Sequence, residues 1–422
     1  DELTLNREHV LTPGQGVEAR LVVVNEQRPF IRPAQDELGI DYVHKALPYA
    51  DFSRQKLVPY GISNSKTPAV WADLNGDGQK ELFIGGNKQT SSVLYRPGQR
   101  GFEPQPASID PERGMIMSAA EIVDLDLNDQ LELILGTSGG DLARSLSDLA
   151  TVRAGLDEEE WTTATIEIGY HNTSVIRAAD IEGDGDLDLF VGNRLVANDF
   201  GAIPPSFLLV NENGQLVQKT VQGFEDLGMV TDANWGDFNG DGTMDLVVVG
   251  EWMQPRFFEN LQGDLREVDL LASELSGLWQ LVLPFDIDRD GDLDYILGNW
   301  GLNSKFKASE AFPLRMYYSD FDNNGSTETV LANGSEAGYY PLLGLDDLAA
   351  QMVFLRKRYP SYAAFAGQTI DEIFSATEMD LARVFEVNTL ESGFLRNNGS
   401  CLLYTSPSPR DLNPNLVFRL MG

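Results

Sequence analysis

Residues Asp237 to Gly250 read DFNGDGTMDLVVVG. Side chains that bear oxygen occur at Asp237, Asn239, Asp241 and Asp245, with a glycine turn among them. The acidic half is typical of a calcium-binding loop, and the β-branched run after it is typical of a buried strand. The phrase is therefore a calcium sensor, a catalytic cluster of carboxylates, or a structural metal loop within a larger fold.

The phrase is one copy of a motif that occurs six times in the 422 residues. We call the copies the first to sixth loops: DLNGDGQKE (Asp73 to Glu81), DLDLNDQLE (Asp124 to Glu132), DIEGDGDLD (Asp180 to Asp188), DFNGDGTMD (Asp237 to Asp245), DIDRDGDLD (Asp286 to Asp294) and DFDNNGSTE (Asp320 to Glu328). The copies recur about every 50 residues, except for a shorter step before the sixth, and such a period indicates a repeat architecture.

Each position of the motif obeys a physical constraint. Positions 1, 3, 5 and 9 carry oxygen in every copy, and position 7 offers its backbone carbonyl. Position 6 is glycine except at Asp129, because a sharp turn there requires a positive φ. Position 2 is always apolar and is expected to face a core: Leu74, Leu125, Ile181, Phe238, Ile287 and Phe321.

Hard oxygen atoms spaced around a glycine turn are the ligands that Ca²⁺ requires, so we predict several structural calcium ions. The predicted ligands are Asp73, Asn75, Asp77, Gln79 and Glu81; Asp124, Asp126, Asn128, Gln130 and Glu132; Asp180, Glu182, Asp184, Asp186 and Asp188; Asp237, Asn239, Asp241, Thr243 and Asp245; Asp286, Asp288, Asp290, Asp292 and Asp294; and Asp320, Asp322, Asn324, Ser326 and Glu328. The second and sixth loops fit the pattern least well.

Three alternatives compete with a structural calcium loop. An EF-hand needs a glutamate at position 12, where the six copies have Ile84, Leu135, Val191, Val248, Leu297 and Leu331. A glycosidase-type carboxylate pair remains possible, but six equivalent copies favour a structural role. A solvated acidic turn without a metal is the third reading.

Short apolar runs closed by glycine follow the loops, and they predict strands buried on both faces. LYRPGQRGF (Leu94 to Phe102), LLVNENGQL (Leu208 to Leu216) and FFENLQGDL (Phe257 to Leu265) then predict hairpins. One unit is therefore a strand, a calcium loop, a buried strand, a hairpin and a strand. Several strands in each repeat of this length predict an all-β fold, a β-propeller.

The loops and the strands that follow them resemble the FG-GAP/VCBS repeats of integrin α-type propellers. GMVTDANWGDFNGDGTMDLVVVGEWM (Gly228 to Met253) and YILGNWGLNSKFKASE (Tyr295 to Glu310) resemble more specifically the secreted bacterial VCBS-repeat proteins, which often carry an ASPIC/UnbV segment. The resemblance covers residues 39–400 and implies a seven-bladed propeller with calcium at blade edges. It also implies an extracellular or cell-surface location, here associated with a bacterial outer membrane. Residues 1–38 resemble the end of an ASPIC/UnbV segment.

The region after the fifth loop departs from the repeat. No strong strand is expected after the sixth loop, and a helical insertion is expected at about 342–385, with a capping box at Thr369 to Glu372. Ser392 to Ser400 is interpreted as the hairpin of a further, interrupted blade, so we expect an incomplete ring. CLLYTSPSPRD, from Cys401 to Asp411, matches the translation of a transposon-end sequencing adapter, so residues 401–422 are predicted to be non-native; a Ser/Pro-rich linker is the alternative.

Composition restricts the possible partners. A formal net charge of −34 argues against nucleic acid and against anionic membrane surfaces, and no apolar run is long enough for a transmembrane helix. The only cysteine, Cys401, lies in the suspected tail, so disulfides and thiolate metal sites are not expected. The start at Asp1, without Met or a signal-like segment, suggests a processing or fragment boundary.

The sequence favours a non-enzymatic binding or adhesion module that recognises an extracellular protein or glycan. His9, His44 and His171 are isolated, and no nucleophile motif stands beside them. Trp300, in GNWGLNSKF, is a candidate for a ligand surface, although packing within a blade is the commoner role of such a residue. The alternative function is a carbohydrate-active enzyme, a lyase or hydrolase, because propellers also carry such activities.

Overall fold

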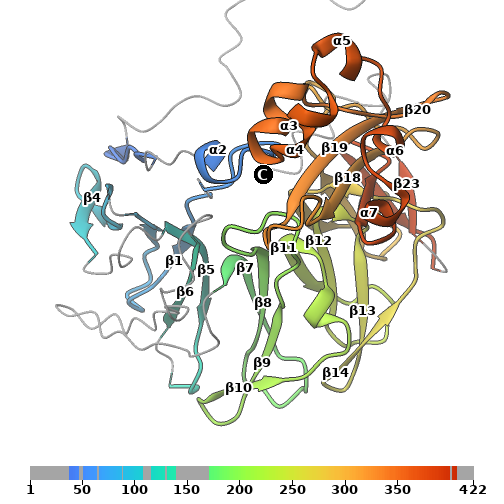
Figure 1. Ribbon diagram of the computed structural model, residues 1–422. Coiled ribbons are helices and arrows are strands. Elements are labelled where there is room, and N and C mark those ends of the chain that lie inside the picture. The colour runs from blue at the N-terminus through green and yellow to red at the C-terminus, as the bar shows by residue number, and fades with distance from the viewer. Residues whose placement is uncertain are drawn as a thin grey trace, which may run out of the picture.

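Most of the regular secondary structure in the described part of the chain is β-sheet. The computed structural model describes residues 38–46, 51–63, 66–87, 89–107, 116–128, 131–138, 171–399 and 402–405. Within these residues there are six sheets and a few short helices (Figure 1). The fold is an all-β propeller with a small helical insertion, as predicted.

Three sheets follow the predicted unit, with each strand hydrogen-bonded to the next along the chain. The first sheet contains β1 (Ala69–Ala72), β2 (Glu81–Ile84), β3 (Val93–Gly98) and β4 (Gly101–Pro106); the third contains β7 (Asn172–Ala179), β8 (Asp188–Leu195), β9 (Phe207–Asn211) and β10 (Leu216–Lys219). The fourth contains β11 (Met229–Gly236), β12 (Asp245–Met253), β13 (Arg256–Leu261) and β14 (Asp264–Val268), and short β15 (Gly277–Leu278) also pairs with β12. The second sheet has two described strands, β5 (Ile116–Val123) and β6 (Glu132–Ser138).

The fifth sheet is interrupted by a long insertion. Its strand order is β16 (Leu281–Phe285), β17 (Asp294–Gly298), β22 (Gly393–Asn397) and β23 (Leu402–Thr405). The interpretation of 392–400 as a further blade is therefore wrong, because β22 pairs with β17, with Tyr295 opposite Leu395. β23 falls in the segment predicted to be non-native, and that origin stays a prediction.

The insertion forms a sheet of its own, which we call the inserted sheet. Its order is β20 (Gly338–Pro341), β19 (Glu328–Ser335), β18 (Leu314–Ser319) and β21 (Arg383–Val387). The expectation of no strong strand after the sixth loop is wrong, because β19 follows it and its first five residues are buried.

Short helices connect β20 to β21 and cover one side of the inserted sheet (Figure 1). They are α3 (Leu345–Gln351), α4 (Phe354–Arg358), α5 (Tyr362–Phe365), α6 (Ile370–Ile373) and α7 (Ala376–Asp380). The capping box predicted at Thr369 and Glu372 is confirmed at the start of α6. Leu348, Met352 and Ile373 pack with Phe321 of the sixth loop in one buried cluster.

A separate apolar core fills each space between successive sheets. Phe83 and Leu133 belong to the core between the first and second sheets, and Ile134 and Leu189 to the next one. Phe190 packs with Leu246 between the third and fourth sheets. Between the fourth and fifth sheets lie residues such as Val247, Phe257, Trp279 and Tyr295. Face-to-face packing of successive sheets in chain order is the arrangement of propeller blades.

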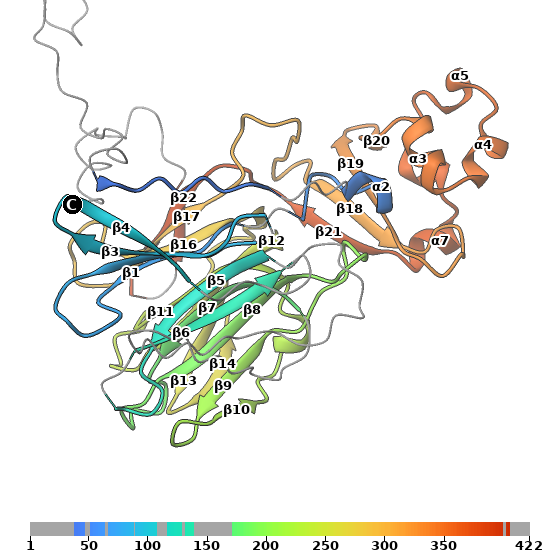
Figure 2. The same cartoon turned by 90° about the vertical axis from the view of Figure 1, so that its left-hand side faces the viewer.

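The inserted sheet lies outside this succession. Figure 2 shows it with its helices at one side of the molecule, far from β3 and β4. Met316 and Phe385 pack there against Met229 and Trp252 at the end of the fourth sheet. The segment with α2 (Asp51–Arg54) joins the same region, since Lys56 Nζ donates a hydrogen bond to the Ala350 carbonyl at 2.7 Å.

A single 3₁₀ turn, η2 (Phe224–Asp226), precedes β11. Among the described residues, no helix is long and apolar enough to cross a membrane.

Candidate metal centres

Each of the six loops joins the first and second strands of a sheet. In every case position 9 is the first residue of the second strand: Glu81, Glu132, Asp188, Asp245, Asp294 and Glu328. The apolar residue at position 2 is buried in five loops, as predicted, and Ile287 is half-buried. The repeat thus places one candidate metal loop on each sheet.

The loop backbone wraps around the aspartate at position 1. In the fourth loop, Asp237 Oδ1 accepts hydrogen bonds from the amides of Gly240 and Asp241 at 2.7 and 3.1 Å. Its Oδ2 accepts from the Gly242 amide at 2.8 Å. The same donors approach Asp180 in the third loop, at 2.7 to 3.2 Å. These bonds fix a tight loop whose oxygen atoms converge.

Position 4 also requires a left-handed backbone, which the sequence reasoning missed. It is glycine in the first, third and fourth loops, with φ of 73° to 75°. The other three loops place Leu127, Arg289 and Asn323 there, with φ of 54°, 66° and 56°. Asparagine tolerates this region, whereas Leu127 and Arg289 are strained there, so the second and fifth loops store backbone energy that the glycine loops do not.

The carboxylate at position 9 closes every loop by accepting a hydrogen bond from the amide of position 2. The amide-to-carboxylate distances are 2.8 Å for Leu74, 3.2 Å for Leu125, 3.1 Å for Ile181 and Phe238, 2.7 Å for Ile287 and 3.0 Å for Phe321. All six carboxylates are buried. The loop therefore remains a closed ring of oxygen atoms that lies against the core.

Burial also raises the pKa of these carboxyl groups, because a charged group loses hydration there. It raises the pKa of Asp245 to about 6 and that of Glu328 to about 7. The pKa values of Glu81, Asp188 and Asp294 are raised for the same reason, and neighbouring loop carboxylates add to each shift. A nearby cation would offset both the lost hydration and the repulsion between carboxylates, and it would lower these pKa values.

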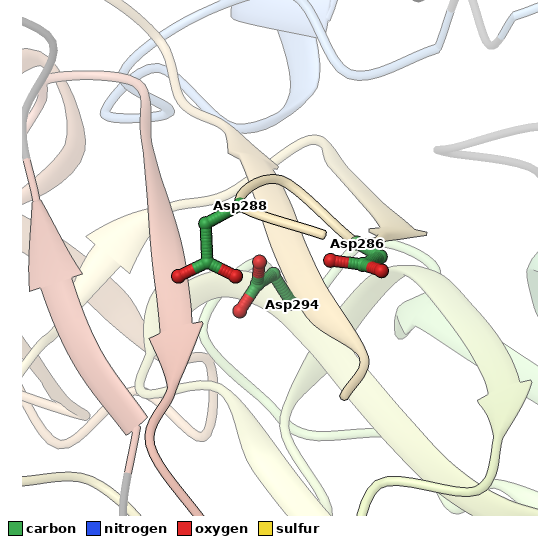
Figure 3. A group of neighbouring side chains, drawn as sticks. All are labelled: Asp286, Asp288 and Asp294. Carbon is green, nitrogen blue, oxygen red and sulfur yellow. The ribbon is translucent and has the colours of Figure 1, made fainter. Parts of the chain in front are cut away.

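Two loops gather their carboxylates most closely. Ligand oxygens of Asp286, Asp288 and Asp294 lie within 4.8 Å of one another, and Figure 3 shows the three side chains converging. Asp320, Asp322 and Glu328 form the second such group. The sixth loop, which fits the motif less well in sequence, is therefore one of the two best assembled among the described residues.

Buried oxygen atoms without partners show that these loops fit a cation. Asp322 Oδ1 in the sixth loop and Glu81 Oε1 in the first loop are buried and accept no hydrogen bond. Such atoms are costly unless a positive partner is present. The donor set is entirely oxygen, which suits a hard ion such as Ca²⁺.

The remaining predicted ligands lie in the same loops with specific bonds. Position 5 accepts the position 7 amide, for example Thr243 to Asp241 at 2.8 Å and Ser326 to Asn324 at 2.8 Å. Asn239 Nδ2 donates to Asp241 Oδ2 at 3.0 Å, and Asp288 forms an ion pair with Arg396. Gln130 falls outside the described residues.

Sequence reasoning missed a second set of residues, the asparagines of the blade hairpins. Asn211, Asn260 and Asn397 end or nearly end the third strand of their sheets and are buried. Each backbone amide donates to the position 9 carboxylate of its own sheet, and the distance is 2.8 Å in all three. The signal was present in the sequence as an asparagine two or three residues before the hairpin glycine (NENG, NLQG and NNG).

Trp300 lies away from the loops. Its ring packs on Tyr60 with centroids 4.6 Å apart and near Phe306 at 6.1 Å. A groove of about 730 Å³ opens elsewhere, between the fourth sheet and β21, and Trp300 is not among its lining residues.

His44 bonds with the Tyr42 and Thr67 hydroxyls, and the His171 ring lies against Phe207.

Comparison with known proteins supports the repeat assignment in part of the chain. Residues 237–297 match the FG-GAP-like repeat family, a segment that runs from the fourth loop through the fifth. No curated protein matches the chain. Among solved structures, it is similar to the exotype rhamnogalacturonan lyase YesX, with 14% sequence identity and a TM-score of 0.25. The match covers 64% of this chain and 64% of that one.

Proposed function

We propose that this chain is a non-enzymatic binding or adhesion module built on a calcium-stabilised propeller, which acts outside the cell or on its surface. The observation that carries the proposal is the repeated closed loop in which carboxylates converge on a buried one, most clearly Asp286 and Asp288 on the buried Asp294. Repulsion among these charges opposes folding, and a bound divalent cation removes it. In this proposal the loops stabilise the fold and leave recognition to other surfaces.

The expected affinity of such loops supports an extracellular location. Extracellular calcium modules have dissociation constants of roughly 10⁻⁴ to 10⁻³ M, so their sites fill outside a cell and empty inside one. The net charge of −34 adds to this dependence, because metal-free loops increase the self-repulsion of the chain.

The groove between the fourth sheet and β21 is the best candidate for the recognition surface. Its volume of about 730 Å³ suits a small ligand or a segment of a larger one. Trp252, Pro255 and Phe385 provide apolar lining, and ion pairs of Arg256 with Glu267 and of Arg383 with Asp226 border it. Trp252 has a φ of 61°, and strain of this kind is concentrated at functional sites.

The proposal is tested by chelation. Each site at a calcium level 100 times its dissociation constant adds about 2.7 kcal/mol, so removal of calcium by EGTA lowers the Tm by several degrees. Magnesium at the same concentration serves as the control for general ionic effects. An unchanged Tm would show that the loops do not stabilise the fold through calcium.

The same groove supports the second candidate, a carbohydrate-active enzyme, because carboxylates and arginines line it together. A glycan array followed by a product assay distinguishes the two functions. Binding without turnover, lost in Trp252→Ala, supports the binding module. Turnover of a bound glycan would support the enzyme.

A further inference from the structure

The hairpin asparagines connect neighbouring metal loops. Asn260, in the fourth sheet, holds Asp245 of its own loop through its backbone amide. Its side-chain Nδ2 donates to the Ile181 carbonyl, at position 2 of the third loop, at 2.9 Å, and to the Met244 carbonyl at 3.1 Å. One residue therefore contacts two loops that lie on different blades.

The arrangement repeats at two other blade interfaces. Asn211 Nδ2 donates to the Leu125 carbonyl of the second loop at 2.7 Å. Asn397 Nδ2 donates to the Phe238 carbonyl of the fourth loop at 2.9 Å. In each case the acceptor is the position 2 carbonyl of the preceding loop. Asn397 occupies this place although the inserted sheet separates it in sequence from its own loop.

These bonds form a continuous chain across four blades. The residue at position 2 receives the asparagine side chain on its carbonyl, and its amide donates to the position 9 carboxylate of the same loop. That carboxylate also accepts the backbone amide of the asparagine of its own sheet, Asn211 at Asp188 and Asn260 at Asp245. The side chain of the same asparagine donates to the preceding loop, which continues the chain. The asparagines are at most 7% exposed, and buried polar networks of this kind are costly to break.

The hairpin turns also pack directly against the preceding loops. A Cβ added to Gly263 would lie 2.8 Å from Cγ of Glu182, at position 3 of the third loop. A Cβ at Gly214 would lie 3.1 Å from the Cβ of Asp126, at position 3 of the second loop. A change in the position of a loop ligand therefore displaces the atoms of the neighbouring hairpin that pack against it.

We infer that Asn211, Asn260 and Asn397 are positioning residues that couple neighbouring calcium sites, so that occupancy of one loop raises the affinity of the next. The inference rests on the proposed calcium binding. The coupling joins the second to fifth loops. The sixth loop lies outside it, because among the described residues no hairpin asparagine donates to Glu328 or to the Phe321 carbonyl.

The test measures calcium occupancy loop by loop with hydrogen–deuterium exchange and mass spectrometry. Metal-free full chain is titrated with calcium, and the midpoint at which each loop peptide gains protection is recorded. Asp241→Ala inactivates the fourth loop, and the readout is the midpoint of the third loop, 180–188. The sixth loop, 320–328, is an internal control.

Coupling predicts that Asp241→Ala raises the third-loop midpoint about fivefold or more and leaves the sixth-loop midpoint unchanged. In the backgrounds Asn260→Asp and Asn260→Ala, the same inactivation shifts the third-loop midpoint less than about twofold. Asn388→Asp is the matched control. Asn388 Nδ2 donates a 2.9 Å hydrogen bond to the Glu274 carbonyl, and neither residue belongs to a metal loop. In the Asn388→Asp background, Asp241→Ala produces the full shift of the third-loop midpoint.

An equal shift with and without the Asn260 side chain would overturn the coupling, and so would loops that bind calcium with no shift in the wild type. If no loop gains protection up to about 10 mM calcium, well above the expected dissociation constants, the proposed calcium function falls together with the coupling. If both Asn260 variants fail to fold, Asn211→Asp gives the same measurement, with Asp184→Ala inactivating the third loop and 124–132 as the readout.

Discussion

Leu127 shows how one residue departs from the pattern of its neighbours. It occupies position 4 of the second loop with φ of 54° and is 60% exposed, whereas Gly76, Gly183 and Gly240 occupy the same position elsewhere. A leucine gains nothing from packing there and bears the cost of the left-handed backbone.

Leu127→Gly is therefore expected to stabilise the protein by about 1 kcal/mol, since the left-handed region costs a residue with a Cβ roughly 1–2 kcal/mol and glycine loses some backbone entropy. Urea denaturation at constant calcium measures the change. Leu127→Ala keeps the Cβ and should give no gain, so equal effects of the two substitutions would refute the strain.

Glu328 makes the stability of the metal-free protein depend on pH. Burial raises its pKa to about 7, above the value of about 4.3 expected in the unfolded chain. The folded state thus binds the proton more tightly than the unfolded state. The contribution of this proton binding to the free energy of unfolding is fully present below about pH 4.3 and is lost as the pH rises through about 7.

In EGTA, Glu328→Gln should therefore become more stable relative to wild type as the pH rises from 5 to 8, since glutamine never acquires the charge. Thermal melts across this pH range give the comparison. A constant difference between the two proteins would mean that the carboxyl group does not titrate there.

The loop is the element at which charge and metal binding compete. Asp322 lies with Asp320 and Glu328 in the sixth loop, and one of its buried oxygen atoms lacks a partner. Without a metal its charge repels the other two, whereas with calcium it supplies a ligand.

Asp322→Asn should accordingly raise the stability of the protein in EGTA and lower it in calcium, by about 1 kcal/mol or more in each case. Chemical denaturation in the two buffers measures both signs. Asp347→Asn, on the exposed face of α3, removes the same charge outside the loops and serves as the control. A change of the same sign in both buffers would contradict the role assigned to the loop.

Elements with strong local signals were predictable from the sequence. The motif predicted the positions of the loops, and the apolar runs predicted the second strands. The Thr369 to Glu372 capping box predicted the start of α6. The role of Asn260 was not predictable, because its partner Ile181 lies 79 residues earlier and the local sequence shows only a hairpin turn. A long-range acceptor leaves no trace in a single sequence.

At the scale of the whole molecule, the net charge of −34 opposes the compact state. Screening by salt reduces this repulsion, and the reduction should matter most when the loops hold no cation. Addition of about 0.5 M NaCl is therefore expected to raise the Tm by several degrees in EGTA and by clearly less in saturating calcium. Differential scanning calorimetry in the four buffers tests this, and equal increments would contradict it.

The overall connectivity was the least predictable level. A propeller was expected from the repeats, with a helical insertion after the sixth loop and a further, interrupted blade at 392–400. The sixth loop belongs instead to the inserted sheet, and β22 returns to the fifth sheet. Strand pairing across a long insertion depends on tertiary packing, which local patterns do not encode.

The insertion between β17 and β22 also has a consequence for the order in which the chain is expected to fold. Gly298 and Gly393 are about 95 residues apart, and closing so long an unfolded segment costs about 3 kcal/mol more entropy than closing a tight turn. Once folded, the insertion brings its own ends together, because the Gly301 amide donates to the Leu390 carbonyl at 2.8 Å. We therefore expect the inserted sheet to fold early and to act as a short connector, so that the fifth blade is completed late, after most of the molecule has formed.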